Sequence, residues 1–437
     1  MKRTIRLPLL ITAILAAVML SACGEMRGAV EEKYDIHNST IVYFDQGSES
    51  YANTGKGTDE NTVYELGSNG KTLAAYTALA MVGEGILELD GKISSHLDPE
   101  LVTEDVRLKD ITLRQLLCHT AGFSPSFEFG VDKKIYTDPG TAFCYSGVGY
   151  IYLQNVIENA GGMPLDQAAS KYVFEPLGMK NSGFENIETI QPYMNAGTAV
   201  LYALLIFILS FLVLSLMALI PGRLIRSGAF KYSRLLPVCF LLAGIINTLA
   251  LLFLFSSNFS KVLPWFLLCF ALMGLVLVLT KKHPKLRNAV VPAMSLLFLL
   301  IGFALPVTLP VCNTLIPPKA NCAYTFRSTG RDMALFCNEL MEKAKEKDGV
   351  FSEMFAPAVT VDECNAWGLG IAIENAGDSP ALYWHSGINP GFQSLYVLVP
   401  DENRYIIILT NSDRGLDYSK ETARTFLGID GTWDIKR

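Results

Sequence analysis

The fold is decided by the stretch Glu65-Leu66-Gly67-Ser68-Asn69-Gly70-Lys71, which lies directly ahead of an apolar helical run. Positions three apart share one face of a helix, so the Lys71 amine can reach the Ser68 hydroxyl. A serine at a helix N-terminus also gains from the backbone donors and the dipole there, and a partly desolvated lysine can act as a general base. The stretch therefore indicates a serine nucleophile with a lysine base. The same residues also suit a helix cap followed by a solvated lysine, which is the alternative interpretation.

Composition excludes several classes of protein. The chain has 437 residues, of which 50% are hydrophobic and 18% are charged. Soluble domains carry about 25% charged residues, so this balance argues against a purely soluble protein. Lys and Arg number 36 against 42 Asp and Glu, with no basic aromatic stripe, which excludes a nucleic-acid binder as a first interpretation. Nine cysteines spread over so long a chain exclude a disulfide miniprotein.

The start of the chain has the pattern of an export signal. Lys2, Arg3 and Arg6 precede an apolar run at residues 7–20. The run ends in Leu20-Ser21-Ala22-Cys23, which resembles a bacterial lipobox. This predicts a signal peptide over residues 1–22 and lipidation of Cys23. The alternative is an uncleaved signal anchor with an ordinary cysteine.

Four apolar runs without a charged residue lie in the middle of the chain, at residues 198–220, 235–255, 262–280 and 289–311. About 20 apolar residues cross a bilayer as a helix, so each run predicts a transmembrane span. Basic loops between the first and second and between the third and fourth runs would face the cytoplasm. The spans contain no ionisable residue, which favours an anchor over a transport path. Four crossings would leave residues 23–197 and 312–437 on one outer face.

The two outer segments carry patterns that fit a single α/β domain. Residues 40–44, 395–399 and 405–409 are rich in β-branched and aromatic residues, which is typical of strands. Residues 71–85 and 113–117 have helical patterns. The sequence therefore predicts one α/β domain, made of residues 23–197 and 312–437 and interrupted by a four-helix transmembrane module at residues 198–311.

Seven sequence blocks along the outer segments point to a known family. They are residues 65–71, 116–122 (Leu-Leu-Cys-His-Thr-Ala-Gly), 139–147 (Pro-Gly-Thr-Ala-Phe-Cys-Tyr-Ser-Gly), 175–179 (Glu-Pro-Leu-Gly-Met), 328–332 (Ser-Thr-Gly-Arg-Asp), 385–392 (His-Ser-Gly-Ile-Asn-Pro-Gly-Phe) and 409–412 (Leu-Thr-Asn-Ser). In these blocks the chain resembles the serine-reactive family of class C β-lactamases, penicillin-binding carboxypeptidases and related esterases and aminopeptidases. The resemblance implies the β-lactamase/penicillin-binding-protein α/β fold, with an antiparallel sheet and a mostly helical region.

The resemblance also implies a role for each matching residue. Ser68 would be the nucleophile that forms an acyl-enzyme, and Lys71 would take its proton. Tyr145 would relay protons between the nucleophile, the leaving group and water. The strand motif His385-Ser386-Gly387 would line the pocket and hold a substrate carboxylate or carbonyl. The backbone N–H groups of Ser68 and Ile388 would form the oxyanion hole.

One position departs from the family pattern. The third residue of the family's Tyr-x-Asn element is Gly147, which has no amide to contact the substrate or the lysine. This counts against conventional β-lactamase or transpeptidase activity and leaves esterase or atypical peptidase activity. The expected function is a membrane-anchored, outward-facing serine hydrolase acting on an ester or amide, such as a cell-wall peptide, a D-amino-acid peptide or a β-lactam. The alternative is a non-catalytic or sensor protein that binds cell-wall fragments or β-lactams in the same pocket.

Other candidate residues receive plainer interpretations. His37, His96 and His283 have no acid or cysteine at ligand spacing, so neither a metal nor a cofactor is expected. His119 lies in a block that is structural in the family. The expected partners are a small-molecule or peptide substrate and the membrane, without nucleic acid. The expected location is the bacterial cell membrane, with the hydrolase on the extracytoplasmic face.

Overall fold

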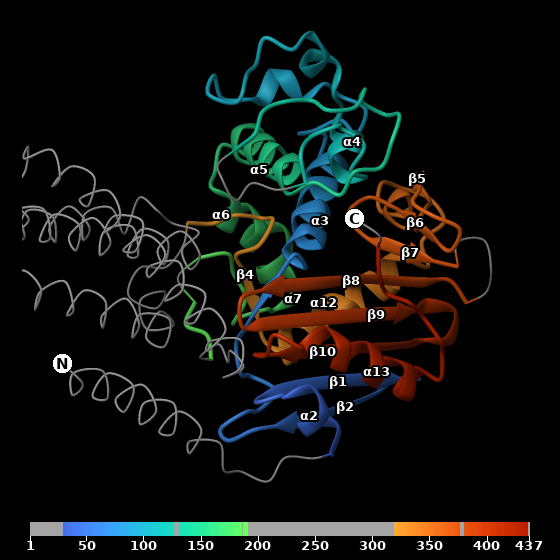
Figure 1. Ribbon diagram of the computed structural model, residues 1–437. Helices are drawn as coiled ribbons and strands as arrows, with labels where there is room; N and C mark the ends of the chain where they lie inside the picture. The colour runs from blue at the N-terminus through green and yellow to red at the C-terminus, as the bar shows by residue number, and fades with distance from the viewer. Residues whose placement is uncertain (1–28, 126–130, 186, 191–318, 376–379, 436–437) are drawn as a thin grey trace, which may run out of the picture. The chain divides into compact units, whose positions relative to one another are not determined.

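Eight antiparallel strands form the main sheet in the computed structural model, which describes residues 29–125, 131–185, 187–190, 319–375 and 380–435 (Figure 1). The strands are β1 (Ser39–Asp45), β2 (Ser48–Thr54), β5 (Val359–Thr360), β6 (Asn365–Trp367), β7 (Ala372–Glu374), β8 (Leu382–Asn389), β9 (Phe392–Val399) and β10 (Arg404–Thr410). Their order in the sheet is β2-β1-β10-β9-β8-β7-β6-β5. The first strand therefore pairs with the last, and Thr40 lies opposite Leu409.

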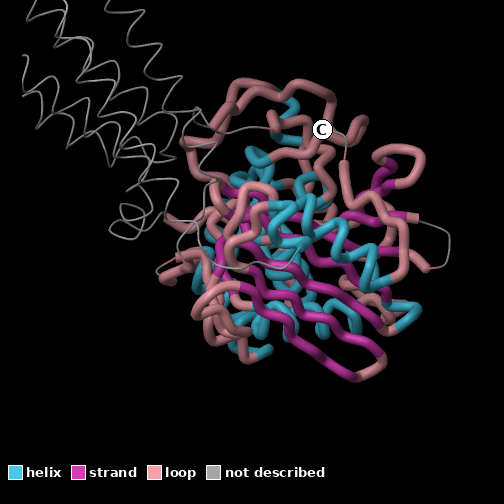
Figure 2. Tube along the Cα trace, turned by 60° about the horizontal axis from the view of Figure 1, so that its bottom comes forward, coloured by secondary structure: helices cyan, strands magenta, loops and turns pink. Residues whose placement is uncertain are grey.

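Helices cover the sheet and build the rest of the described chain. They are α2 (Ala29–Tyr34), α3 (Gly70–Gly83), α4 (Leu113–Leu117), α5 (Gly147–Gly161), α6 (Leu165–Ala169), α7 (Glu175–Leu177), α12 (Gly330–Lys343) and α13 (Gly415–Leu427), with short 3-10 or π turns at η1 (Ile93–His96), η2 (Val106–Asp110), η3 (Ser170–Phe174), η4 (Ser352–Met354) and η5 (Pro400–Glu402). Strands β9 and β10 are buried along nearly their whole length. Successive side chains point to opposite faces of a sheet, so both faces are covered, and helices flank the strands in Figure 2.

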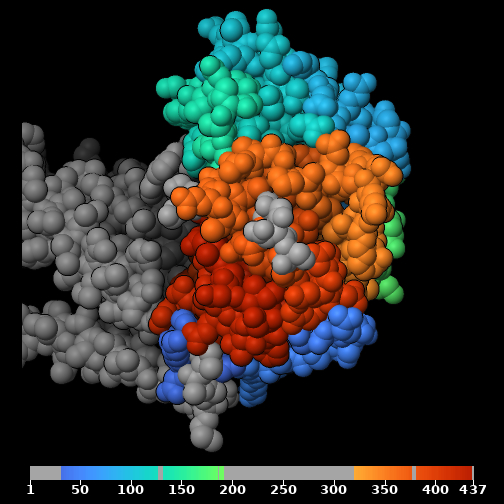
Figure 3. All heavy atoms as spheres, turned by 90° about the vertical axis from the view of Figure 1, so that its right-hand side faces the viewer, coloured from blue at the N-terminus to red at the C-terminus, as the bar shows by residue number. Residues whose placement is uncertain are grey.

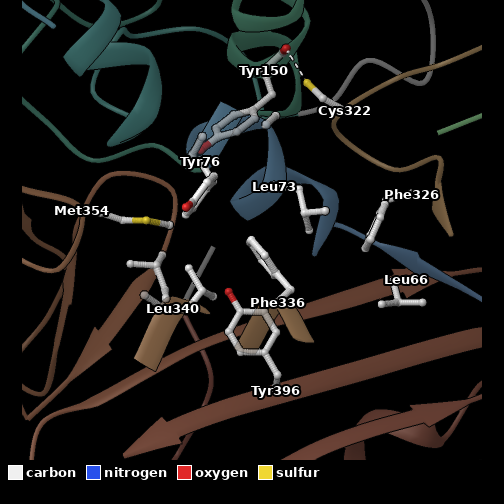
Figure 4. Close-up of a cluster of buried hydrophobic side chains, with 14 of the residues drawn as sticks. Leu66, Leu73, Tyr76, Tyr150, Cys322, Phe326, Phe336, Leu340, Met354 and Tyr396 are labelled. Atoms are coloured by element: carbon white, nitrogen blue, oxygen red, sulfur yellow. Dashed lines mark hydrogen bonds between the residues drawn. The ribbon is translucent and has the colours of Figure 1, made fainter. Parts of the chain in front are cut away.

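Helix α3 runs through the interior between the sheet and the other helices. Almost all of its residues are buried, which is typical of a helix that is apolar on every side. Tyr76 of α3 packs edge-on against Phe336 of α12, with ring centroids 5.8 Å apart (Figure 4). The Thr72 hydroxyl lies 2.8 Å from the Tyr396 hydroxyl on β9. These contacts fix the start of α3 relative to the central strands.

A second, two-stranded sheet joins distant parts of the chain. Strand β3 (Tyr64–Gly67) leads into α3, and its antiparallel partner β4 (Phe326–Ser328) leads into α12, with Glu65 opposite Arg327. Residues Met26–Met194 and Pro318–Arg437 therefore close into one compact unit. In the space-filling view, residues of the helical region in cyan lie against the later residues in orange (Figure 3).

One predicted element of the fold class is corrected. The sequence predicts a four-helix transmembrane module at residues 198–311, but within the described ranges no helix is both long enough and apolar enough to cross a membrane. The longest helix described, α5, has 15 residues and extends about 22 Å, which is shorter than the roughly 30 Å hydrocarbon core of a bilayer. Residues 198–311 themselves lie outside the described part, as do the predicted signal peptide and Cys23. The fold class that the described residues establish is the α/β fold.

Candidate active site

Ser68 and Lys71 meet at the start of α3. Strand β3 ends at Gly67, and the helix begins at Gly70, so the two residues lie on the turn and the first helical turn that follow the strand. The Lys71 amine donates a hydrogen bond to the Ser68 hydroxyl at 2.9 Å. Lys71 is only 2% exposed, and no carboxylate pairs with it in the part of the chain that the structure describes. A buried amine in contact with a serine hydroxyl is an arrangement suited to proton transfer.

A backbone carbonyl completes this pair. The oxygen of Ala323 accepts a hydrogen bond from the Lys71 amine at 2.8 Å and a longer one from the Ser68 hydroxyl at 3.4 Å. Ala323 lies in a short segment that is tied to α5, because the Cys322 thiol donates to the carbonyl of Tyr150 at 2.9 Å (Figure 4). Sequence reasoning missed Ala323, since a main-chain carbonyl leaves no signal in residue type.

Tyr145 lies just ahead of α5 and faces the lysine. The Lys71 amine is 5.0 Å from the centroid of the Tyr145 ring and 5.7 Å from that of Tyr150. The rings of His119 and Trp367 lie 4.4 Å and 5.6 Å from the Tyr145 ring. The structure thus brings together three of the residues that the sequence singled out, Ser68, Lys71 and Tyr145.

Gly147, which stands where the family has asparagine, is the first residue of α5. Its N–H donates to the carbonyl of Pro125 at 3.0 Å. Ser146 caps the helix, since its hydroxyl accepts the N–H of Gly149 at 2.9 Å. This turn is therefore built by main-chain contacts and a cap, without a side-chain amide at position 147.

The strand motif of β8 lies beside Ser68. A Cβ atom at Gly387 would lie 1.8 Å from the carbonyl oxygen of Leu66, so only glycine lets β8 approach β3 this closely. A Cβ atom at Gly67 would lie 3.0 Å from the Ile388 nitrogen. The backbone of Ile388 is thus adjacent to the residue that precedes Ser68. Strand β7 pairs with β8 only as far as Trp384, so the backbone of residues 385–389 extends past the end of β7.

His385 and Ser386 precede this close approach. The Nδ1 atom of His385 lies 2.8 Å from the carbonyl of Ser386, and because a carbonyl can only accept, Nδ1 carries the proton. The His385 ring lies 6.2 Å from the Tyr145 ring and 5.5 Å from Trp367. All the predicted substrate-binding residues of β8 therefore lie on the strand that passes Ser68 and Tyr145.

His119 is buried within the same group of rings. Its Nδ1 atom accepts the N–H of Ser146 at 3.0 Å. Burial lowers the pKa of His119 well below its ordinary value, and the nearby charges of Lys71 and His385 lower it further. The imidazole is therefore neutral at physiological pH, with its proton on Nε2.

The remaining candidate ligands are dispersed. Across the described ranges, no three His, Cys, Asp or Glu side chains are grouped so as to hold a metal ion. The described cysteines, Cys118, Cys144, Cys322, Cys337 and Cys364, are all unpaired. Burial raises the pKa of the Cys322 thiol to about 12, so this cysteine is a packing residue rather than a nucleophile.

Comparison with curated proteins gives relatives named as D-alanyl-D-alanine carboxypeptidases. Candidate D-alanyl-D-alanine carboxypeptidases of Salmonella paratyphi B and Salmonella newport are each 28% identical over 148 residues. The match covers 28% of this chain and 34% of theirs, so the chain spans about a third of the length of these relatives.

Solved structures share the fold over most of this chain. A penicillin-binding protein from Bacillus halodurans has a TM-score of 0.57 at 14% identity, covering 92% of this chain and 99% of its own. An octameric penicillin-binding protein homologue from Pyrococcus abyssi has a TM-score of 0.56 at 15% identity, and the match covers 91% of this chain and 75% of the homologue. A D-stereospecific amidohydrolase from Streptomyces has a TM-score of 0.55 at 16% identity, and the match covers 92% of this chain and 100% of the amidohydrolase.

The family model for Beta-lactamase matches residues 22–198 and 310–427, which is more than half of the chain. The two matched segments contain every residue described above at the site, and they are the segments that fold together around Ser68 and Lys71. The chain therefore belongs to the β-lactamase family and is a serine hydrolase of that family.

Proposed function

We propose that this serine hydrolase cleaves an amide or ester bond next to a D-amino acid, through an acyl-enzyme on Ser68. The observation that carries the proposal is the 2.9 Å contact between the Ser68 hydroxyl and the buried Lys71 amine. The substrate class is supported by the names of the relatives, which are candidate D-alanyl-D-alanine carboxypeptidases, and of one structural neighbour, a D-stereospecific amidohydrolase. The absence of a side chain at Gly147 counts against efficient β-lactam hydrolysis.

In the first step the Ser68 oxygen attacks the substrate carbonyl, and its proton passes to Lys71. When the amine is neutral, the 2.9 Å contact runs from the hydroxyl to the amine, while the Ala323 carbonyl holds one amine N–H. The negative charge on the substrate oxygen would be stabilised by the N–H groups of Ser68 and Ile388. The bond to the leaving amine or alcohol then breaks, and Tyr145 would pass the proton from Lys71 to the leaving group, which returns Lys71 to its neutral form.

In the second step water hydrolyses the acyl-enzyme. Tyr145 and Lys71 would take one proton from the water as its oxygen attacks the ester carbonyl, and Ser68 would recover its hydroxyl as the acid product leaves. Residues 385–388 extend past the end of β7, so their backbone is placed to pair with an extended substrate beside Ser68.

Replacing Ser68→Ala in the purified full-length protein tests the mechanism. Turnover of a D-alanyl ester and of a D-alanyl-D-alanine peptide should fall by about 10⁴-fold or more, because the nucleophile is lost. A fluorescent fluorophosphonate should label the wild type and not the variant. Ser94→Ala, at an exposed serine of η1, is the matched control and should keep full turnover.

The outcome also separates an enzyme from a binding protein. Turnover that survives Ser68→Ala would contradict the acyl-enzyme mechanism. Labelling that depends on Ser68, without hydrolysis of any D- or L-substrate, would favour the alternative of a sensor that binds acyl donors in this pocket. Equal turnover of D- and L-peptides would contradict the proposed substrate class.

A further inference from the structure

His119 contacts the chain on both sides of Tyr145. Its carbonyl accepts the N–H of Cys144 at 2.8 Å, and its Nδ1 atom accepts the N–H of Ser146 at 3.0 Å. Its ring also lies 4.4 Å from the Tyr145 ring, at an angle of 37°. One residue therefore fixes the backbone before the tyrosine, the backbone after it and the face of its ring.

The backbone of His119 has an unusual conformation that makes these contacts possible. Its φ of 57° lies in the left-handed region, which side-chain-bearing residues adopt rarely, although Asn, Asp and His do so more often than others. A backbone conformation of this kind is kept only where contacts with the surrounding residues stabilise it. Here it follows directly after α4, whose cap residue is Cys118. The left-handed residue ends the helix and leaves both its carbonyl and its ring in contact with residues 144–146.

The imidazole of His119 is buried, but only one of its two ring nitrogens has a hydrogen-bond partner in the described structure. His119 is 2% exposed, and its Nε2 atom has no hydrogen-bond partner in the described structure. Buried polar atoms are nearly always paired, because an unmade hydrogen bond in the interior lowers stability. A histidine retained for stability alone would be expected to use both nitrogens. The ring also packs against Phe143, Tyr150 and Trp367, but the one hydrogen bond of the side chain that the structure gives and its shortest ring contact are both directed at the tyrosine turn.

We propose that His119 is a positioning residue for Tyr145, holding the phenol in place against Lys71 and Ser68. The inference rests on the proposed function, in which Tyr145 transfers protons. The Lys71 amine lies 5.0 Å from the centroid of the Tyr145 ring, so a change in the ring's tilt or in the turn at residues 144–146 would move the hydroxyl relative to the reacting atoms. Proton transfer depends on position within fractions of an ångström, whereas substrate binding along β8 does not involve His119.

Three substitutions test this proposal with the D-alanyl ester as substrate. His119→Ala removes the Nδ1 acceptor and the ring, and it should lower kcat by about 10²-fold while KM stays within about twofold. His119→Asn keeps an acceptor near the Nδ1 position and tolerates a positive φ, so its kcat should be at least about tenfold above that of the alanine variant. His96→Ala, at the end of η1, is the control and should match the wild type. Rates are divided by the fraction of protein that fluorophosphonate labels, so that misfolded protein does not count.

The decisive measurement combines His119→Ala with Tyr145→Phe. If His119 acts through the tyrosine hydroxyl, the double variant should be no slower than Tyr145→Phe alone, because there is no hydroxyl left to position. If the two losses multiply, or if His119→Asn is as slow as His119→Ala, the positioning role is overturned. Unchanged turnover in Tyr145→Phe would instead overturn the proposed role of Tyr145 itself. The two failures are therefore distinguishable.

Discussion

Two buried bases, Lys71 and His119, lie close together with different hydrogen-bond partners. The lysine amine contacts the neutral oxygens of Ser68 and Ala323, while the histidine accepts a backbone N–H and carries its proton on the other nitrogen. The charge of Lys71 is one of the causes that lower the pKa of His119. A neutral imidazole beside the amine avoids placing two cations in one apolar pocket. His119 therefore contributes its ring to the group of aromatic side chains at the site without binding the proton that Lys71 takes from Ser68.

This neutral histidine should make the stability of the fold depend on pH. An unfolded histidine binds a proton near pH 6.5, whereas the pKa of folded His119 is well below that value. As the pH falls below about 6.5 the unfolded state gains the proton first, so the free energy of unfolding should fall by up to about 1.4 kcal/mol per pH unit. Above about pH 6.5, His119 should not make the free energy of unfolding change with pH. Urea unfolding of the wild type and His119→Asn at several pH values checks this, and equal slopes for the two proteins would contradict it.

Residue type alone indicates some of this site but not all of it. The Ser68 and Lys71 spacing predicts a contact that the structure contains, because a helical turn brings such positions together. The family resemblance singled out Tyr145 and the β8 motif, which lie beside that pair. Ala323 escaped prediction because it acts through its carbonyl. His119 was assigned a structural role because its block is structural in the family, and residue type does not reveal its ring contact with Tyr145.

At the scale of elements, the strands and helices predicted for residues 23–197 and 312–437 lie close to where the chain's own patterns place them. Residues 395–399 and 405–409 lie within β9 and β10, and residues 113–117 coincide with α4. The β3–β4 sheet was not predicted, since strands of four and three residues leave little pattern and their pairing spans most of the chain. The close approach of β8 to β3 likewise depends on Gly387 having no side chain.

Replacing Gly387→Ala should separate these two elements. The new Cβ would lie 1.8 Å from the Leu66 carbonyl oxygen, which is backbone and cannot turn aside, so β8 must move away from β3. The Ile388 N–H would then move away from Ser68. We expect kcat to fall by about 10²–10³-fold, as on losing one oxyanion donor, and the free energy of unfolding to fall by about 1–3 kcal/mol.

The control for this variant is Gly83→Ala, the last residue of α3. A Cβ at Gly83 would meet only the Val350 side chain, at an ordinary 3.8 Å. Its kcat should equal that of the wild type, and its stability should be unchanged or slightly higher. Steady-state kinetics and urea unfolding of both variants give the answer. A Gly387→Ala protein with normal kcat would show that the close approach is not needed for catalysis.

At the scale of the whole molecule, the segments on either side of residues 191–318 are tied together by buried polar contacts. The Asp332 carboxylate accepts the N–H of Asn181 at 2.6 Å and the hydroxyl of Ser182 at 2.9 Å. The C-terminal end is held in a similar way, since the buried Glu374 accepts the N–H groups of Thr432 and Trp433 at 2.7 Å and 3.1 Å. Single carboxylates thus anchor long stretches of chain at defined points.

Asp332→Ala should weaken the fold without changing the chemistry. Its loss leaves the part-buried donors at residues 181 and 182 without their acceptor, which should lower the free energy of unfolding by about 1–3 kcal/mol. The kcat per labelled active site should remain normal, because Asp332 does not contact the site residues. Arg331→Ala, which removes an exposed ion pair with Glu60, is the neighbouring control and should cost less than about 1 kcal/mol. Urea unfolding measures both, and equal stabilities for the two variants would contradict the prediction.

The pairing of β3 with β4 also determines when the active site can form during synthesis. A nascent chain that ends near residue 190 contains Ser68 and Lys71, but neither the partner strand of β3 nor the Ala323 carbonyl that holds the lysine. Strand β8, whose Ile388 backbone lies next to Gly67, is made later still. Contacts between such distant residues form late, because the ends of a long loop must first meet. The surroundings that make Ser68 reactive can therefore be complete only after residues 323–388 have been synthesised.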